Sequence, residues 1–312
     1  MATSVLDNGS VLPSQGRAAV RLVPKIDRPA TLSEYRPISV LNTDYKLIAS
    51  VLARRLRTTL PSKIQMHQRG GVPGRYIFDS LCLYRDVIED AAQRADVPAF
   101  CPHTHRRRDR FGAAIVAFDF EKAYDLVNRE VLWETMRVMG FPDLFITWLK
   151  GLYSITTLCP LNGSALVGEI HNVGSLRQGC PLSVHLFVLF IEPLLVALDS
   201  NLEGILLHGH KVAVRGFVDD LAVFVRSDRD ILRACEIVER FCAWTKMRVN
   251  KSKCKLLGIG DWSFELQTER KNANLASGTF GNKTPVKIWP VEWLKPVKSL
   301  KLLGIDFTAN LK

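Results

Sequence analysis

Two apolar segments that carry aspartate residues constrain the fold of this chain more than any other feature. In AIVAFD, strand-forming residues 114–118 lead directly to Asp119. In GFVDDLAVFV, Asp219 and Asp220 interrupt a run of β-branched and aromatic residues. Negative charge among apolar residues is costly unless a cation compensates it. We therefore predict that the two segments form neighbouring antiparallel strands and bring three carboxylates together.

Such a carboxylate set suits divalent metal ions. Mg²⁺ prefers hard oxygen ligands and keeps several waters, so two or three carboxylates plus substrate phosphates suffice. Two such ions, roughly 3.5–4 Å apart, can activate a hydroxyl and stabilise both oxygens of an in-line phosphoryl displacement. Chance alone also supplies about three adjacent acidic pairs in a chain with 31 acidic residues among 312, so Asp219-Asp220 taken alone equally fits a polar turn.

Apolar spacing predicts a mixture of strands and helices. The expected strands are 21–25, 35–41, 113–118, 158–166, 169–173, 212–215, 221–225, 255–259 and 300–307, with a hairpin turn at 217–220. The expected helices are 43–60, 77–91, 128–139, 183–198 and 227–247. Thr43 or Asp44 should cap the first helix, and Pro61 should end it. Its apolar face is predicted to contain Leu47, Ile48, Val51, Leu52, Leu56 and Leu60. Because the elements lack a strict βαβ rhythm, we predict an α+β fold.

Charge and cysteine content limit the partners and the compartment. The chain carries 42 Lys and Arg against 31 Asp and Glu, a formal net charge of +11, which predisposes it to bind polyanions, nucleic acid first. Seven cysteines without a CxxC pair argue against a disulfide framework or a zinc ribbon and favour a reducing compartment. The apolar run 186–198 is interrupted by Glu192 and Pro193, so we expect no transmembrane helix.

Seven segments in a fixed order carry a family resemblance. They read RPISVLNTDYKLIASVLARRL, GGVPGRYIFDSLCLYRDV, AFDFEKAYDLV, SLRQGCPLSVHLFVLFIEPLL, GFVDDLAVFV, VNKSKCKLL and LKLLGIDF. Together they resemble the reverse transcriptase domain of non-LTR retrotransposons, the long interspersed elements, over about residues 12–310. The resemblance implies a right-hand polymerase with fingers and palm that extends a primer 3′-OH on an RNA template with deoxynucleoside triphosphates. It also implies two Mg²⁺ ions, with Mn²⁺ as an alternative.

The resemblance assigns the catalytic and metal-binding residues. Asp119 matches the first catalytic aspartate, and the carbonyl of Phe120 matches a further metal ligand. Asp219 and Asp220 match the paired aspartates. Where the family has Tyr or Phe, then Ala, then two Asp, this chain has Val218 in the second position. This departure leaves both carboxylates in register and puts fidelity or strand fit in question more than catalysis.

Further matches concern the nucleotide and the primer. Tyr124 matches the aromatic gate against a ribonucleotide 2′-OH, although its spacing alone better fits an ordinary aromatic residue at the start of a helix. Gln178 and Gly179 match the segment that packs against the incoming nucleotide. Lys253 matches a lysine that assists pyrophosphate departure as an acid. Lys25 and Arg36 match fingers residues that hold the triphosphate, although they equally fit solvated surface charges. Leu303 and Gly304 match the primer-grip turn, for which an ordinary turn glycine is the alternative.

The resemblance also predicts the domain organisation. Residues 1–112 should form the N-terminal fingers region, and residues 113–312 the palm, with a fingers segment interleaved at about 155–180. The palm should have an antiparallel sheet with helices on one face and end at the primer-grip-like turn. Relative to the family, we expect no endonuclease before Leu12 and a largely absent thumb. The loop with Cys101, His103 and His105 resembles an insertion, and it offers no second ligand pair for zinc.

Two functions remain open from the sequence. The first is an RNA-directed DNA polymerase, whose missing parts a larger retrotransposon polyprotein could supply. The second is a non-catalytic nucleic-acid-binding remnant of such a polymerase. An intron maturase and an RNA-dependent RNA polymerase fit less well, because Tyr124 disfavours ribonucleotides and no maturase-type extension follows Phe307. We expect the protein to be nuclear or cytoplasmic, with no membrane partner.

Overall fold

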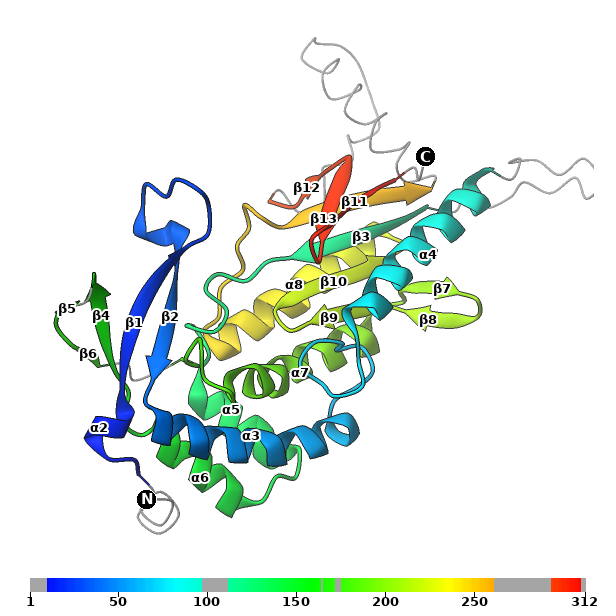
Figure 1. Ribbon diagram of the computed structural model, residues 1–312. Helices are drawn as coiled ribbons and strands as arrows, with labels where there is room; N and C mark the ends of the chain where they lie inside the picture. The colour runs from blue at the N-terminus through cyan, green and yellow to red at the C-terminus, as the bar shows by residue number, and fades with distance from the viewer. Residues whose placement is uncertain (1–9, 97–111, 164, 172–174, 261–292, 310–312) are drawn as a thin grey trace, which may run out of the picture.

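A computed structural model describes residues 10–96, 112–163, 165–171, 175–260 and 293–309 of the chain (Figure 1). Helices and strands mix without a repeated βαβ order, which confirms the predicted α+β class. Two larger sheets lie at opposite sides of the molecule, and helices fill the space at their base (Figure 1).

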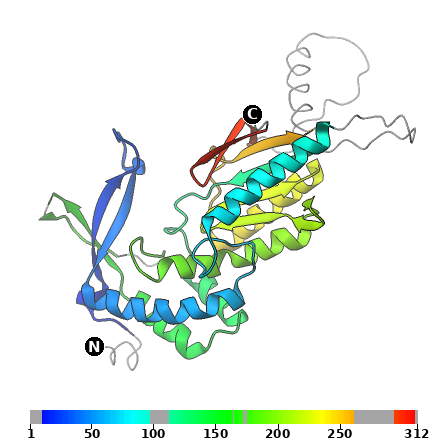
Figure 2. The same cartoon turned by 45° about the vertical axis from the view of Figure 1, so that its right-hand side comes forward.

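The first sheet is built on a long hairpin. Strands β1 (Arg17–Pro24) and β2 (Tyr35–Leu41) pair antiparallel, and a 3-10 turn (Leu32–Glu34) lies between them. Strand β4 (Thr157–Asn162) pairs parallel with β1, and the short β5 (Ala165–Leu166) and β6 (Ile170–His171) pair with β4. Figure 2 shows the β1–β2 hairpin projecting from the helical base. Most of its outer half is exposed to solvent.

The second sheet has the order β12-β11-β3-β10-β9. Its strands are β3 (Gly112–Phe118), β9 (Val214–Phe217), β10 (Asp220–Val225), β11 (Lys255–Gly260) and β12 (Lys295–Pro296). All neighbours pair antiparallel except β11 and β12, which are parallel. Side chains alternate between the two faces of a strand, and here both faces are buried because both are covered.

Helices cover the second sheet on both faces. Helix α4 (Ile77–Asp96) packs on one face, where it contacts β3, β9 and β11. Helices α7 (Ser183–Asn201) and α8 (Asp228–Thr245) pack on the other face, against β9 and β10 respectively. Ile115 faces the α4 side, and the neighbouring Val116 faces the α7 side. The sequence predicted helices on one face, and α4 therefore corrects that expectation.

The remaining elements form the base and two small hairpins. The base contains α2 (Pro13–Gly16), α3 (Thr43–Lys63), α5 (Arg129–Val138) and α6 (Asp143–Tyr153). The hairpins are β7 (Ile205–Leu207) with β8 (His210–Val212), and β13 (Ser299–Leu302) with β14 (Ile305–Thr308). Helix α3 touches both α2 and α7, so it connects the base of the first sheet to the helices under the second.

The structure corrects three details of α3. Pro61 lies inside the helix, which continues to Lys63, because proline in the last turn displaces only one hydrogen bond. Asn42 occupies the N-cap position in place of Thr43 or Asp44. Leu47 and Val51 were predicted to be buried but are 64% and 54% exposed. The buried face instead consists of Tyr45, Ala49, Leu52, Ala53, Leu56 and Leu60.

Other differences concern short elements. Helix α6 was not predicted, although its eleven residues carry an apolar face that includes Ile146, Leu149 and Leu152. The strand expected at 158–166 turns back after Asn162 to make β5, and the strand expected at 300–307 turns at Leu303-Gly304. Both residues of this second turn have positive φ angles, 51° and 88°, which end the strand.

Helix α7 combines length with apolar composition. Within the described ranges, it is the helix whose length and hydropathy would allow it to cross a membrane. Most of α7 is buried under the second sheet, and buried core helices have the same composition.

Candidate active site

The sheet register places the aspartate residues. Strands β3 and β10 are antiparallel with Phe118 opposite Leu221, so Asp119 and Asp220 continue this register side by side. Asp219 lies in the turn between β9 and β10, where Phe217 pairs with Asp220. The tertiary structure thus brings Asp119 to the strand end that carries the paired aspartates, although the two segments are far apart in sequence.

The carboxylates interact electrostatically. Burial raises the pKa of Asp219 above its ordinary value, the charge of Asp119 raises it further, and Arg36 acts in the opposite direction. Burial also raises the pKa of Asp220, and the charges of Asp219 and Asp119 add to this effect, so that the pKa reaches about 6. A site that holds negative charge at this cost is one that a cation stabilises.

The donor set suits Mg²⁺, although the carboxylates do not converge fully. In the part of the chain that the structure describes, no three acidic, histidine or cysteine side chains lie close enough together to hold one metal ion. Carboxylate oxygens are the ligands that Mg²⁺ prefers, and their shared charge is what a divalent cation would offset. The residue types therefore fit the predicted ions.

The backbone around Asp119 is held by the segment before β11. The Asp119 carbonyl accepts from the Asn250 N–H at 2.8 Å, and the Asp119 N–H donates to the Cys254 Sγ at 3.4 Å. The next residue, Phe120, forms an isolated antiparallel bridge with Val249. Lys253 Nζ lies 3.8 Å from Asp119 Oδ2, although its side chain is 69% exposed. The structure thus places both Phe120 and Lys253 beside the first aspartate.

A cavity of about 210 Å³ adjoins the aspartates. The β13–β14 turn contributes Leu303 to its wall. Gly304 follows Leu303 in the turn, with a φ of 88° that favours glycine. The charged residues that line the cavity are Asp119, Asp220, Lys253, Lys255 and Lys301. The turn expected to serve as a primer grip therefore reaches the carboxylate site.

Tyr124 lies between the aspartates and the core. Its ring stacks on Phe187 of α7, with 5.0 Å between ring centroids and 19° between planes. Burial raises the pKa of Tyr124 well above its ordinary value, and the charge of Asp219 adds to this effect. The aromatic ring is thus held against α7 near Asp219.

The predicted nucleotide-contacting residues lie beside the β1–β2 hairpin. Gln178 Nε2 donates to Asp125 Oδ1 at 3.4 Å, and the Gln178 carbonyl accepts from the Ser39 N–H at 2.8 Å. A Cβ on Gly179 would lie 2.5 Å from the Ser39 carbonyl oxygen, so only glycine fits this close approach. Lys25 interacts electrostatically with Asp125, as Arg36 does with Asp219.

Sequence reasoning missed two residues of the site. Asp125 accepts a hydrogen bond from Gln178 and interacts electrostatically with Lys25. Burial raises the pKa of Asp125. Gln68 is fully buried beside the β9–β10 turn. The only sequence signal for Gln68 is its place shortly before a pair of glycines, and this does not reveal a contact 150 positions away. Cys101, His103 and His105 lie outside the described residues.

The antiparallel sheet presents its aspartates on the side of the basic β1–β2 hairpin, an arrangement compatible with a nucleotidyl-transferring polymerase of the right-hand type. Residues 23–307 match the family described as reverse transcriptase (RNA-dependent DNA polymerase). The chain belongs to this family.

The relatives place the chain among retrotransposon proteins. It is 33% identical over 254 residues to the Transposon TX1 uncharacterized 149 kDa protein of Xenopus laevis, covering 80% of this chain and 18% of that protein. It is 26% identical over 298 residues to the Pol polyprotein of the type-2 retrotransposable element R2DM of Drosophila melanogaster, covering 94% of this chain and 26% of that protein. These relatives confirm the resemblance to non-LTR reverse transcriptase domains. The chain spans about a quarter or less of their lengths.

Solved structures confirm the fold. A truncated apo telomerase from Candida tropicalis has a TM-score of 0.54 at 12% identity, with 96% of this chain and 54% of that chain covered. Telomerase from Candida albicans with a telomeric RNA fragment has a TM-score of 0.53 at 11% identity, covering 98% and 47%. At these identities the likeness concerns the fold, which is that of polymerase fingers and palm.

Proposed function

We propose that this chain is an RNA-directed DNA polymerase domain that extends a primer 3′-OH on an RNA template. The observation that carries the proposal is the register of β3 and β10, which sets Asp119 beside Asp220 at the end of a covered sheet. Family membership supports the same reaction. Its substrates would be deoxynucleoside triphosphates, because Tyr124 is fixed beside Asp219.

Asp119, the Phe120 carbonyl, Asp219 and Asp220 would hold two Mg²⁺ ions. When bound, such ions activate the attacking hydroxyl and stabilise the leaving oxygen. The residues of this chain position the substrates. Arg36 and Lys25 would hold the triphosphate, Gln178 and Gly179 would pack against the nucleotide, and Leu303-Gly304 would support the primer. Lys253 would assist the departure of pyrophosphate.

Primer extension on an RNA template tests the proposal. Asp219→Asn keeps the side-chain size but removes the charge, so we expect extension to fall at least about 10³-fold. Thermal stability should not fall, because burial of the ionised Asp219 is costly. Asp143→Asn is the matched control, since the Asp143 side chain is 85% exposed at the start of α6.

The alternative is a non-catalytic nucleic-acid binder. It predicts salt-sensitive RNA binding with no templated incorporation by the wild-type chain, and equal binding by the wild type and Asp219→Asn. Binding without extension, in the presence of Mg²⁺ or Mn²⁺, would therefore reject the polymerase. Extension that persists unchanged in Asp219→Asn would reject the assignment of the carboxylates.

We also propose the domain division and the setting of the protein. Residues 1–112 with about 155–180 would form the fingers, and the rest of 113–312 the palm; pairing of β4 with β1 supports this division. The domain would act within a larger retrotransposon polyprotein in the nucleus or cytoplasm. The free cysteines of the described part are compatible with a reducing compartment.

A further inference from the structure

A buried glutamine contacts the turn that carries Asp219. Gln68 is 0% exposed. Its Oε1 accepts from the Val218 N–H at 2.9 Å, and its Nε2 donates to the Val218 carbonyl at 3.3 Å. One side-chain amide therefore binds both backbone polar groups of the residue that precedes Asp219.

Val218 has a backbone conformation that needs such support. Its φ is 59°, in the left-handed region that β-branched residues rarely adopt. A backbone held in this region is strained and persists only when its surroundings fix it. Two hydrogen bonds from a buried amide provide this fixation, because the Val218 N–H and carbonyl would lose their partners if the residue relaxed.

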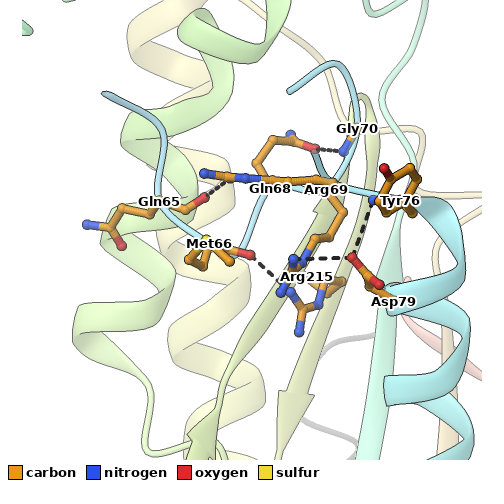
Figure 3. Close-up of polar contacts among 9 residues, drawn as sticks. Gln65, Met66, Gln68, Arg69, Gly70, Tyr76, Asp79 and Arg215 are labelled. Atoms are coloured by element: carbon orange, nitrogen blue, oxygen red, sulfur yellow. Dashed lines mark hydrogen bonds and ion pairs between the residues drawn. The ribbon is translucent and has the colours of Figure 1, made fainter. Parts of the chain in front are cut away.

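Gln68 belongs to a segment that is itself fixed to the second sheet. Residues 64–71, here called the strap, run beside β9, and Figure 3 shows polar contacts of the strap, including those of Gly70 with Gln68 and of Met66 with Arg215. The Arg69 N–H donates to the Gly216 carbonyl at 2.8 Å, and the Gly216 N–H donates to the His67 carbonyl at 2.9 Å. Arg215 of β9 donates to the Met66 carbonyl at 3.0 Å. These bonds place the strap directly beside the β9–β10 turn.

Further hydrogen bonds, from Arg75 and within the strap itself, stabilise the conformation of the strap. Arg75 donates to the carbonyls of Ile64 and Gln68, each at 2.7 Å. The Gly70 N–H donates to Gln68 Oε1 at 2.9 Å, which orients the amide toward Val218. A Cβ on Gly70 would lie 2.5 Å from the Val218 nitrogen, so glycine permits the close approach. The strap therefore presents Gln68 in one orientation.

We propose that Gln68 is a positioning residue that holds Val218 in its left-handed conformation and thereby fixes Asp219 for catalysis. The step from Val218 to catalysis rests on the proposed function of Asp219. The step from Gln68 to Val218 rests on the hydrogen bonds alone. Because a β-branched side chain disfavours positive φ, valine at this position increases the dependence of the turn on Gln68.

Amide hydrogen exchange tests the contact without using activity. Gln68→Met keeps the length of the side chain and removes both hydrogen bonds, so exchange of the Val218 amide should become at least about tenfold faster. Gln65→Met is the matched control in the same strap, because the Gln65 side chain is exposed. Unchanged protection in Gln68→Met would overturn the proposal. Rapid exchange of Val218 in the wild type would overturn it equally, even if Gln68→Met fails to fold.

Primer extension tests the consequence. In Gln68→Met we expect kcat to fall about 10- to 100-fold with little change in the KM for nucleotide, because a misplaced catalytic group lowers the rate of chemistry. Val218→Gly removes the strain, so Gln68→Met should lose at least about threefold less activity in that background. Equal losses in both backgrounds would overturn the positioning role. An inactive wild type with a protected Val218 amide would instead reject the proposed function and retain the contact.

Discussion

The two sheets of this molecule differ in how their faces are covered. In the second sheet, β3 and β10 are buried over nearly their whole lengths, with α4 on one face and α7 and α8 on the other. In the first sheet, the outer half of β1 is exposed, and Leu22 and Val23 are 40% and 41% exposed. The second sheet is therefore buried on both faces, whereas the outer half of the β1–β2 hairpin in the first sheet is exposed to solvent.

This difference matches the roles proposed for the two regions. A metal-dependent displacement requires carboxylates that stay in one geometry, and a doubly covered sheet supplies it. A triphosphate must enter and leave, so residues that hold it belong on a region with exposed surface. The carboxylates accordingly lie at the end of the covered sheet, and Arg36 lies on the exposed hairpin.

The largest expected effect distinguishes the cores of the two sheets. Leu257→Ala in β11 removes a side chain that is 0% exposed, so we expect a loss of about 2–5 kcal/mol in the free energy of unfolding. Leu22→Ala in β1 is the matched variant and should change it by less than about 0.5 kcal/mol. Chemical denaturation measures both. Similar losses would show that the hairpin carries as much of the core as the second sheet.

A buried charge under the second sheet gives the next effect. Burial raises the pKa of Glu192 in α7 to about 7, against an ordinary value of 4.5. Between these values the folded chain binds more protons than the unfolded chain, so the free energy of unfolding falls as the pH rises. Glu192→Gln should remove this fall and stabilise the protein at pH 8 by up to about 3 kcal/mol.

The measurement is denaturation at pH 4 and pH 8. Glu192→Gln should have nearly wild-type stability at pH 4, where the carboxyl is largely protonated in both states. Glu89→Gln in α4 is the control, because the Glu89 side chain is 48% exposed. A variant that gains no stability at pH 8 would contradict the cost assigned to this buried charge.

Arg36 tests the role of the hairpin. Arg36→Ala should raise the KM for nucleotide about tenfold, which corresponds to about 1.4 kcal/mol, while the free energy of unfolding stays unchanged. Arg21→Ala, an exposed arginine on β1, is the matched control. Steady-state extension kinetics measure the KM for nucleotide, and chemical denaturation measures the free energy of unfolding. An equal effect of both variants would mean that only net charge matters.

The smallest effect concerns a surface ion pair of the first sheet. Arg17 of β1 lies 2.5 Å from Glu169, and their side chains are 50% and 45% exposed. Exposed pairs contribute little because water and salt screen them, so Glu169→Gln should cost less than about 0.5 kcal/mol. Thermal unfolding at low and high salt checks this value. A loss above about 1 kcal/mol would show that the pair anchors the hairpin.

Parts of the fold could be predicted from local sequence pattern. The β9–β10 turn, the helix that Gly140 ends and the strand that leads to Asp119 all have strong local signals. Helix α6 and the exposure of Leu47 and Val51 did not follow from pattern, because burial depends on which surface a helix meets. The roles of Lys253, Tyr124 and Gln178 came from family resemblance, and they stay predictions.

The sequence by itself determined the α+β class, the family and the identities of the three aspartates, since residue type and order carry this information. The sequence also predicted that the two aspartate segments are neighbours. Only the tertiary structure decided the register that sets Asp119 beside Asp220, that α4 covers the far face of the second sheet and that Gln68 binds Val218. These contacts join residues far apart in the chain. Their geometry follows from the packing of whole elements, which no local pattern specifies.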